Sequence, residues 1–515
     1  MLLTVLKNLA RRRTAAPPPS AVQPAPSLEQ GLALQAQGRV DAAEAIYRRL
    51  LDEHPDHVDA AHLLGVLLHR AHRSADAIPL LERVVSLVPD QAEAVLHLGS
   101  AYQGADLLLE AERAYRRCIA IASDLISAHV SLGILLKQQG RLDESRAALE
   151  TALQLQPGAA EVWHNLGNLQ RDLGDEAGAC KSFERALDID PEFLEARYSR
   201  ALALLGSGDL DQGWEAHEMR LSLPRRAADL RPFAHPYWQG ENLSGRTLLV
   251  WGEQGIGDEM FHAGMYQELL DAEVRCVFEC SAKLVPLFEC SFPGATVVPR
   301  TRPAHPATLD GVDAQVPAGS LGRYLRRSLA RFPRRTAYLR PDPRRLAYWQ
   351  ERLAALGAGP KVGFCWRSSD IRGERALACT VLDQWDALLR TPQVHWICLQ
   401  YDECRDELED SIARHQVRLH RFDIDYFDDL AEVSALTAAL DLVISAPTAV
   451  SVQAAALGVE VWQLTYGADW QTHGSPGVPW FPSMTRYQRR WDEPWSSVLG
   501  RVETALKERA IRSGP

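Results

Sequence analysis

A glycine-rich turn near the middle of the chain carries the first candidates for chemistry. The segment Gly252–Asp258 reads GEQGIGD and separates a short apolar stretch from a segment with helical periodicity. Gly255 and Gly257 let the backbone turn tightly and approach a ligand, and the free N–H groups at the start of the following helix favour a negative group. His262 follows Asp258 by four residues, so an acid and a histidine share one helix face and could supply a general base. A helix cap beside a structural histidine is the alternative interpretation.

Two loops further along the chain carry groups suited to an anion. Trp366, Arg367 and Ser368 follow an apolar strand, and an arginine beside hydroxyl groups at a strand's carboxyl end could hold a phosphate or diphosphate. Pro447 is interpreted as a rigid break between the preceding strand and the next helix. Thr448 follows it and can cap that helix. The free N–H groups of that helix would form a second anion site facing the first.

Metal, redox and common hydrolase sites are not expected. Asp423 and Asp425 form an Asp-x-Asp triplet, but the same triplet occurs at 188–190, so a ribose contact by Asp423 or a solvated loop is favoured over a metal ligand. The glycine spacing departs from GxGxxG, and the GxSxG, HExxH and P-loop motifs are lacking. The nine cysteines are scattered without a CxxC pair, which indicates reduced thiols in a cytoplasmic protein.

The elements that must position these loops alternate between strand and helix. Strands are expected at 247–251, 273–280, 295–299, 314–317, 361–366, 395–400, 417–422, 442–445 and 459–464. Helices are expected near 258–270, 382–390, 405–415, 428–440, 448–457 and 495–509. This pattern predicts two doubly wound α/β units with a ligand cleft between their facing strand ends.

The first part of the chain is an internal repeat with a step of 34 residues. One register holds small residues, a second holds bulky ones and a third holds proline or serine: Gly31, Gly65, Gly99, Gly133, Gly167; Tyr47, Leu81, Tyr115, Leu149, Phe183; Pro55, Pro89, Ser123, Pro157, Pro191. Small residues let two helices approach, bulky residues fill the gap to the next unit, and proline ends the second helix. Spacing and residue types resemble the tetratricopeptide repeat (TPR) consensus.

A repeat array of this kind predicts a concave surface that captures a protein partner. The expected concave positions are Glu29, Leu63, His97, Ser131 and Asn165, which form no asparagine ladder. We therefore expect one dedicated protein partner rather than a sequence-independent grip on peptides. An array that only holds the rest of the chain in an oligomer is the alternative.

Composition excludes several classes of protein. The chain has 515 residues and a net charge of −11, which disfavours nucleic acid as a partner. Residues 1–26 place an apolar stretch before a basic run and then become rich in proline and alanine, which predicts a flexible tail rather than a secretory signal. No stretch of 18 apolar residues occurs, so no transmembrane helix is expected.

A set of short motifs outside the repeat registers resembles bacterial TPR-containing glycosyltransferases of GT-B architecture. The motifs are GWE and HEMR in 213–220, WQGENLSG in 238–245, GEQGIGD, WRS, LQYDEC, PTAVSVQAAALG, Pro479–Ser483 and Trp491. Such enzymes are related in layout to O-linked N-acetylglucosamine transferases and in their catalytic lobes to lipopolysaccharide heptosyltransferases. The layout is also similar to that of flagellin glycosyltransferases, which attach nonulosonic acids to Ser or Thr of flagellin.

The resemblance implies a role for several residues. The heptosyltransferase-like pattern has an Ile-Gly-Asp whose aspartate is the general base, which matches Asp258. Donor nucleotides of GT-B enzymes bind the C-terminal lobe, which implies phosphate contacts by Arg367, Ser368, Thr448 and Ala449 and nucleoside contacts near Gln400 and Asp423. No cofactor is implied beyond a CMP- or UDP-sugar co-substrate, and no metal is needed because basic side chains and helix N-termini neutralise the leaving phosphate.

One segment departs from the family pattern. Many relatives have Asp-Thr and then His-Leu-Ala before the small-residue helix, whereas Pro447–Gln453 lacks both the aspartate and the histidine. The departure indicates either a different donor or lost activity. Gln453 could replace one hydrogen bond of the missing histidine but cannot carry its charge.

The sequence as a whole predicts an α-helical array followed by two Rossmann-like lobes. The expected domains are a tail (1–26), about six repeats (27–226), an acceptor-side lobe (227–345) and a nucleotide-sugar lobe with a closing helix (346–515). The expected function is transfer of a sugar from a nucleotide donor to Ser or Thr of a protein held by the repeats, with flagellin and a nonulosonic acid as the most specific candidates. The alternatives are a non-catalytic adaptor with a degenerate GT-B domain and a transferase acting on a glycan or lipid.

Overall fold

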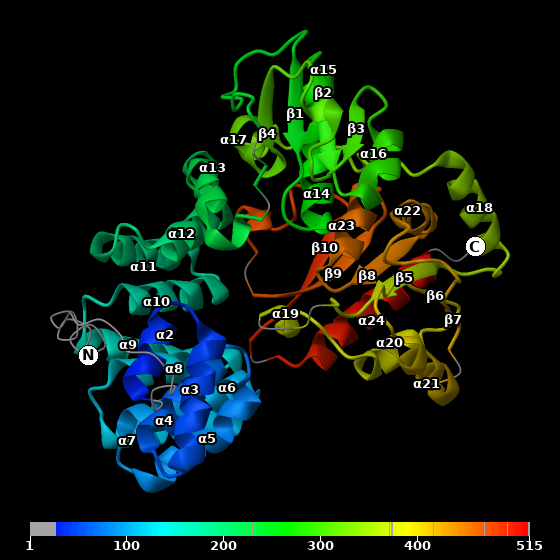
Figure 1. Ribbon diagram of the computed structural model, residues 1–515. Coiled ribbons are helices and arrows are strands. Elements are labelled where there is room, and N and C mark those ends of the chain that lie inside the picture. The colour runs from blue at the N-terminus through cyan, green and yellow to red at the C-terminus, as the bar shows by residue number, and fades with distance from the viewer. Residues whose placement is uncertain are drawn as a thin grey trace, which may run out of the picture. The chain divides into compact units, whose positions relative to one another are not determined.

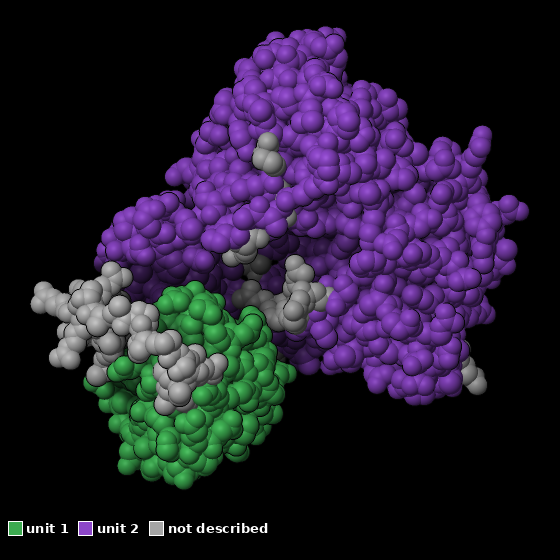
Figure 2. All heavy atoms as spheres, viewed as in Figure 1, with its two compact units in different colours: residues 1–135 green, residues 136–515 purple. Residues whose placement is uncertain are grey.

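The computed structural model describes residues 27–228, 230–231, 233–369, 371, 374–415, 417–467, 469–491 and 493–512. The predicted flexible tail, residues 1–26, lies outside them. The chain divides into two compact units, Met1–Leu135 and Leu136–Pro515 (Figure 2). All 13 tryptophans fall in the second unit, so tryptophan fluorescence reports on that unit alone.

Helical hairpins make up the described chain as far as residue 217 (Figure 1). Twelve helices occur in this described part: α2 (Leu28–Ala36), α3 (Val40–Glu53), α4 (Val58–Arg70), α5 (Ser74–Leu87), α6 (Ala92–Gly104), α7 (Leu108–Ile121), α8 (Ile126–Gln138), α9 (Leu142–Leu155), α10 (Ala160–Asp172), α11 (Glu176–Ile189), α12 (Leu194–Ser207) and α13 (Leu210–His217). Of all the helices in the described residues, none is both long and apolar enough to cross a membrane.

Left-handed residues make the turn inside the hairpins. Gly38, Gly140, Gly174 and Gly208 have φ angles of 73°, 76°, 81° and 88°. The two intervening hairpins use His72 and Asp106, with φ angles of 59° and 61°, at the same point of the repeat. Glycine adopts this conformation without a steric penalty, which explains its recurrence at the turn.

The small and bulky registers of the repeat contact each other directly. A Cβ added at Gly31 would lie 2.3 Å from Tyr47 Cε1, and one added at Gly167 would lie 2.5 Å from Phe183 Cε1. The same clash would occur at Gly65 against Leu81. Each glycine therefore makes room for the large side chain 16 residues later, as the sequence registers predict.

We predict that Gly167→Val destabilises the second unit by about 1–3 kcal/mol, because the fully buried ring of Phe183 has no space to move away. The measurement is urea unfolding followed by tryptophan fluorescence. Gly158→Val is the matched control, because no atom lies within 4 Å of a Cβ added there. Equal stability of the two variants would contradict the packing explanation.

The first α/β lobe contains a four-stranded parallel sheet of order β3-β2-β1-β4 (Figure 1). Its strands are β1 (Thr247–Trp251), β2 (Arg275–Cys280), β3 (Thr296–Pro299) and β4 (Ala314–Pro317). Its helices are α14 (Ile256–His262), α15 (Tyr266–Asp271), α16 (Val285–Ser291) and α17 (Gly322–Leu325). Short 3₁₀ turns include η1 (Glu218–Ser222), η2 (Pro224–Arg226), η3 (Ala263–Met265), η4 (Ala282–Leu284), η5 (Pro306–Thr308), η6 (Ala318–Ser320) and η7 (Leu329–Arg331).

The second α/β lobe contains a six-stranded parallel sheet of order β10-β9-β8-β5-β6-β7. Its strands are β5 (Lys361–Cys365), β6 (His395–Cys398), β7 (Leu419–His420), β8 (Leu442–Ser445), β9 (Val461–Tyr466) and β10 (Met484–Arg489). Its helices are α18 (Pro343–Ala354), α19 (Glu374–Leu377), α20 (Asp386–Leu389), α21 (Arg405–His415), α22 (Leu430–Ala438), α23 (Ala449–Ala456) and α24 (Trp495–Arg512), with 3₁₀ turns η8 (Leu382–Trp385) and η9 (Trp470–Thr472).

The strand order fixes where a ligand can bind in each lobe. Counted within its own lobe, the second sheet has the doubly wound order 3-2-1-4-5-6 read from its β7 edge, and the first sheet has the order 3-2-1-4. The order reverses between β1 and β4 in one lobe and between β5 and β8 in the other. Ligands of such sheets bind beyond the carboxyl ends of the strands at this switch point.

Most expected elements occur, although several expectations were wrong; the helix expected near 382–390, for example, is divided into η8 and α20. The strand expected at 417–422 is only Leu419–His420, and the helix expected at 258–270 is divided into α14, η3 and α15. Strand β10 was not expected at all. It pairs with β9 at an edge of the sheet, where a strand needs fewer apolar residues than a central one.

Within the second unit, the last repeats are fastened to the α/β lobes by buried aromatic side chains. The hydrogen bonds run from Trp214 Nε1 to Arg326 O (3.0 Å), from His473 Nδ1 to Leu205 O (2.9 Å) and from Trp491 Nε1 to Asp172 O (2.7 Å). The Trp214 ring also contacts Trp470 and Trp480 edge to face. These contacts join residues more than a hundred positions apart into one core.

His473 gives this junction a pH dependence. Because Leu205 O can only accept and the indole N–H of Trp480 donates to Nε2 (2.8 Å), the imidazole is neutral with its proton on Nδ1. Burial lowers the pKa of His473 from 6.5 to about 4. Its contribution to stability is therefore complete above pH 6.5 and is lost as the pH falls from 6.5 towards 4.

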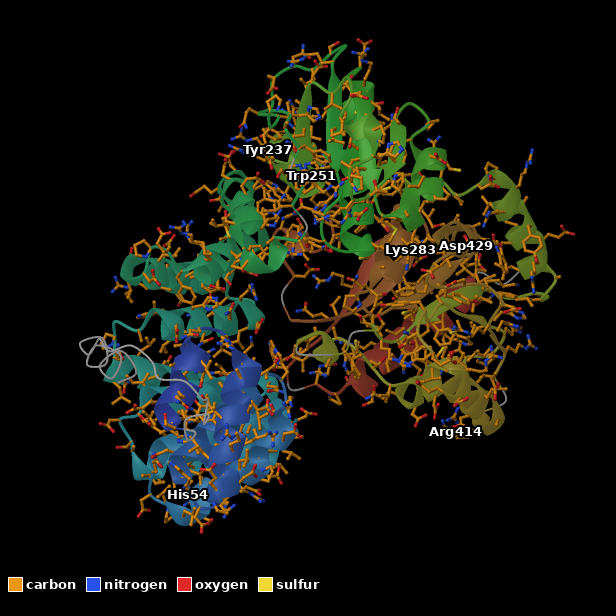
Figure 3. The ribbon with its side chains drawn as sticks, in the orientation of Figure 1. His54, Tyr237, Trp251, Lys283, Arg414 and Asp429 are labelled. Carbon is orange, nitrogen blue, oxygen red and sulfur yellow. The ribbon has the colours of Figure 1, made fainter. Side chains whose placement is uncertain are left out.

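We predict that the wild type loses about 2 kcal/mol more free energy of unfolding between pH 7 and 5 than His473→Gln does, because only the wild type takes up this proton on unfolding. Urea unfolding followed by tryptophan fluorescence at both pH values measures the difference. His54→Gln changes an exposed histidine (Figure 3) and should keep the wild-type pH dependence. Identical dependence in His473→Gln would contradict the assignment.

Candidate functional site

A cavity of about 660 Å³ lies in the second unit. Its walls come from three parts of that unit: the turn before α14, the strand ends and loops of the second α/β lobe, and the last repeats. Seven of the predicted site residues line it: Gly255, Gly257, Asp258, Ser368, Pro447, Thr448 and Ala449. The cavity thus coincides with the switch points that the strand order defines.

The glycine-rich turn forms the first wall. Gln254 has a φ of 65°, which reverses the chain and lets α14 start at the carboxyl end of β1. Asp258 Oδ2 accepts a hydrogen bond from Gly255 N at 3.1 Å, so the carboxylate caps the turn while lining the cavity. A Cβ added at Gly257 would lie 3.5 Å from Ala449 Cα. The starts of α14 and α23 therefore meet at this point, as the alternation of strands and helices predicts.

A buried ion pair holds the turn from behind. Glu253 accepts two hydrogen bonds from Arg220, Nη2 to Oε1 at 2.6 Å and Nε to Oε2 at 3.0 Å. Gly319 N donates to the same carboxylate at 2.8 Å, and Ser320 Oγ accepts from Arg220 at 2.9 Å. Burial disfavours the charge of Glu253, but the adjacent Arg220 outweighs it and lowers the pKa of Glu253 to about 2. The glycine-rich turn is thus anchored to η1, directly after the last repeat.

His262 lies behind the turn and is not among the described residues that line the cavity. It is 3% exposed, and no described residue hydrogen-bonds to its Nδ1. Burial lowers the pKa of His262, while the charge of Glu253 opposes the shift. The end of α14 is buried on several faces, since Glu259, Met260 and Phe261 are buried as well. A catalytic role for His262 stays a prediction.

The loop after β5 forms part of the second wall but turns its arginine away. Arg367 pairs with Asp402 at 2.9 Å and with Glu407 at 2.7 Å, and it does not line the cavity in the described structure. Gln400 is fully buried, and its Oε1 accepts from the backbone N–H groups of Trp366 and Arg367 at 3.2 and 3.3 Å. Trp366 is buried in the core of the lobe. Of this loop, Ser368 and Ser369 line the cavity.

The start of α23 completes the second wall. Thr448 caps the helix, its Oγ1 accepting from Val450 N at 3.3 Å, as the sequence predicts. Gln453, one turn later, is buried and donates to Ser434 Oγ at 2.9 Å, away from the cavity. Asp423 is exposed in the loop after β7 and does not line the cavity either. Its predicted contact with a ribose, like that of Gln400 with the nucleoside, stays a prediction.

The polar or aromatic residues of the cavity wall that were missed from the sequence include Arg171, Gln463, Thr465, Trp470 and Arg486. Thr465 directly follows the strand expected at 459–464, which could have indicated a strand end, whereas Arg486 lies inside β10, a strand that the sequence did not predict. Arg171 carries no local signal, because its place in the wall depends on how the last repeats pack on the lobes. Among the described residues, no cluster of three or more His, Cys, Asp or Glu is arranged to hold a metal ion.

Fold and cavity together define the class of protein: an array of helical repeats followed by a parallel α/β region whose strand ends share one cavity. The tetratricopeptide repeat family matches residues 28–91 and 130–192. The repeats predicted from the 34-residue step are therefore confirmed.

One curated protein and two solved structures illustrate the similarity. Protein FlbA of Caulobacter vibrioides (strain ATCC 19089 / CIP 103742 / CB 15) is 33% identical over 356 residues, which cover 65% of this chain and 59% of FlbA. The match thus spans less than two thirds of that relative's length. The crystal structure of MamA is 27% identical, covering 32% of this chain and 97% of that one with a TM-score of 0.29. A thermophilic TPR protein in Thermus thermophilus is 25% identical, covering 35% and 97% with a TM-score of 0.32.

We predict that Arg220→Met destabilises the second unit by about 3–5 kcal/mol, because it leaves the carboxylate of Glu253 buried without its counter-charge. Tryptophan fluorescence during urea unfolding measures the loss. The double variant Arg220→Met/Glu253→Gln should recover part of it. Arg323→Met breaks a partly exposed pair with Glu215 and should cost less than about 1 kcal/mol. A loss no larger in Arg220→Met than in Arg323→Met would contradict the anchoring role.

Proposed function

We propose that the chain is a GT-B glycosyltransferase that moves a sugar from a nucleotide-sugar donor to Ser or Thr of a protein. One observation carries the proposal. Asp258 and the starts of α14 and α23 lie at one cavity, which is at the switch points of the two parallel sheets. A carboxylate beside free helix N–H groups suits a reaction that removes a proton from a nucleophile and releases a phosphate.

The proposed step is a single displacement at the anomeric carbon of the sugar. The acceptor hydroxyl attacks that carbon and passes its proton to Asp258, while the bond to the donor phosphate breaks and the nucleotide leaves with the electron pair. Ser368, Thr448 and the N-terminal turn of α23 support the leaving phosphate, since hydroxyl and amide donors stabilise negative charge where it develops. No cofactor or metal has a part in this step.

The repeats are proposed to present the acceptor protein, for which flagellin and a nonulosonic acid are the most specific candidates. Support comes from the tetratricopeptide repeats themselves and from the motifs shared with flagellin glycosyltransferases. The cytoplasm is the proposed location, which the nine free cysteines favour.

A non-catalytic adaptor is the second candidate, and two contacts favour it. Arg367, which the family resemblance assigns to phosphate, is engaged by Asp402 and Glu407. Gln453, at the place of the family's histidine, hydrogen-bonds to Ser434 instead of facing the cavity. An adaptor would keep the fold and the partner surface without turnover.

The purified chain, incubated with CMP- and UDP-sugar panels and candidate acceptor proteins including flagellin, is expected to add the mass of one sugar to an acceptor. Intact-protein mass spectrometry detects the addition, and peptide mapping locates it on Ser or Thr. Binding of an acceptor without a mass shift under any donor would favour the adaptor. Transfer to a glycan or lipid alone would exclude the proposed acceptor class.

We predict that Asp258→Asn lowers the transfer rate by about 100- to 10 000-fold, because asparagine cannot accept the proton of the acceptor hydroxyl. Initial rates of acceptor modification measure the effect. Asp188→Asn, which alters an exposed acid of the repeats, should keep the wild-type rate. Full activity of Asp258→Asn would exclude this residue as the base.

A further inference from the structure

Three cationic side chains line the cavity, and Arg367 is not among them in the described structure. They are Lys137 of α8, Arg171 of α10 and Arg486 of β10. Lys137 is already neutralised by Asp172 at 2.6 Å. The question is therefore whether Arg171 and Arg486 are available to a ligand.

Arg486 lies beside the first turn of α23. It is paired in register with Gln463 of β9, whose Nε2 donates to Ser451 Oγ of that turn at 3.0 Å. The Arg486 side chain is only 13% exposed, and its nearest carboxylate, Asp469, is 3.7 Å away. No described residue accepts a hydrogen bond from its Nε. A mostly buried guanidinium with one long contact has donors to spare.

Thr465 is an independent observation that points to a ligand. Its side chain is 3% exposed and lines the cavity, yet no described residue hydrogen-bonds to its Oγ1. It lies two residues after Gln463 in β9, so both point to the face that also carries Arg486. Buried hydroxyl groups in native proteins almost always have a hydrogen-bond partner. A ligand in the cavity could be the partner of the Thr465 hydroxyl group.

Arg171 approaches the same cavity from the repeats. It lies in the last turn of α10, next to Asp172, whose main-chain oxygen receives the indole N–H of Trp491. Within the described part of the chain, the guanidinium of Arg171 makes neither an ion pair nor a side-chain hydrogen bond. The acids of the cavity wall have other partners: Asp172 pairs with Lys137, Asp469 accepts from Gln471 N and Asp258 accepts from Gly255 N. Among the described cations of the wall, Arg171 is thus the one without an ion-paired carboxylate, and it interacts with Glu176 of α11 through charge alone.

We propose that Arg486, Thr465 and Arg171, together with the first turn of α23, form the phosphate-binding subsite of the cavity, with one of its cations supplied by the repeats. Two guanidinium groups and a free hydroxyl offer donors to a group that only accepts, which is the chemistry of a phosphate or diphosphate ester. The inference rests on the proposed function in taking that phosphate to be the one that leaves with the nucleotide. In this proposal Arg486 and Arg171, rather than Arg367, neutralise the negative charge of the leaving phosphate.

The test is calorimetric titration of the full chain with inorganic pyrophosphate, UDP and CMP, with uridine and cytidine as phosphate-free probes. At least one phosphate-bearing probe is expected to bind, and Arg486→Gln and Arg171→Gln should each weaken it about 10-fold or more, since each removes a charge-assisted contact. Thr465→Val should weaken it about threefold or more, since it removes a neutral hydrogen bond. Arg185→Gln, a change at an exposed arginine of α11, should stay within about twofold of the wild type.

Several results would overturn the subsite. Failure of every phosphate probe to bind would do so, as would wild-type affinity in both Arg171→Gln and Arg486→Gln, or a loss confined to Arg367→Gln. Tighter binding of uridine or cytidine than of the matching nucleotide would also contradict it. Arg171→Lys keeps the charge and should recover much of the affinity, which separates a binding role from a folding defect. If the arginines control phosphate binding but no sugar is transferred, the proposed function fails while the subsite stands.

Discussion

The hydrogen-bonded ion pair between Arg220 and Glu253 is the contact on which the site depends. Glu253 belongs to the glycine-rich turn and Arg220 to the segment directly after the last helical repeat, so one buried contact fixes the turn relative to the end of that repeat. Both side chains are almost fully withdrawn from water, and each is stable there only because the other is present. The position of Asp258 five residues later follows from this anchoring.

The three walls of the cavity have different physical origins. The glycine-rich turn is held by charge, the start of α23 by the parallel sheet beneath it, and the end of α10 by an indole hydrogen bond. Where the two lobes also meet farther along, Lys283 contacts the Phe427 ring and pairs with Asp428 at 2.5 Å, close to Asp429 in Figure 3. The lobes therefore contact each other through partly exposed polar groups as well as through a buried hydrophobic core.

Periodic features of the fold could be predicted from the sequence, and the directions of single side chains could not. Gly167 and Phe183 recur at fixed steps because each repeat buries the same contact, and the strands before Gly252 and Trp366 are continuous apolar runs. Thr448 was predicted correctly as a cap because capping is local. The ion pairs of Arg367 and the position of Arg171 in the cavity wall depend on residues distant in sequence, and no local pattern encodes them.

The hydrogen bond from Trp491 to the main chain of Asp172 sets a rule for how such a chain can change length. An added or lost repeat moves everything before it by a whole structural unit. A change upstream of residue 136 leaves every residue of the cavity wall in place, whereas one between Asp172 and the lobes would separate the indole from its acceptor. We therefore expect the cavity to tolerate a change in repeat number only in the part of the array that precedes residue 136.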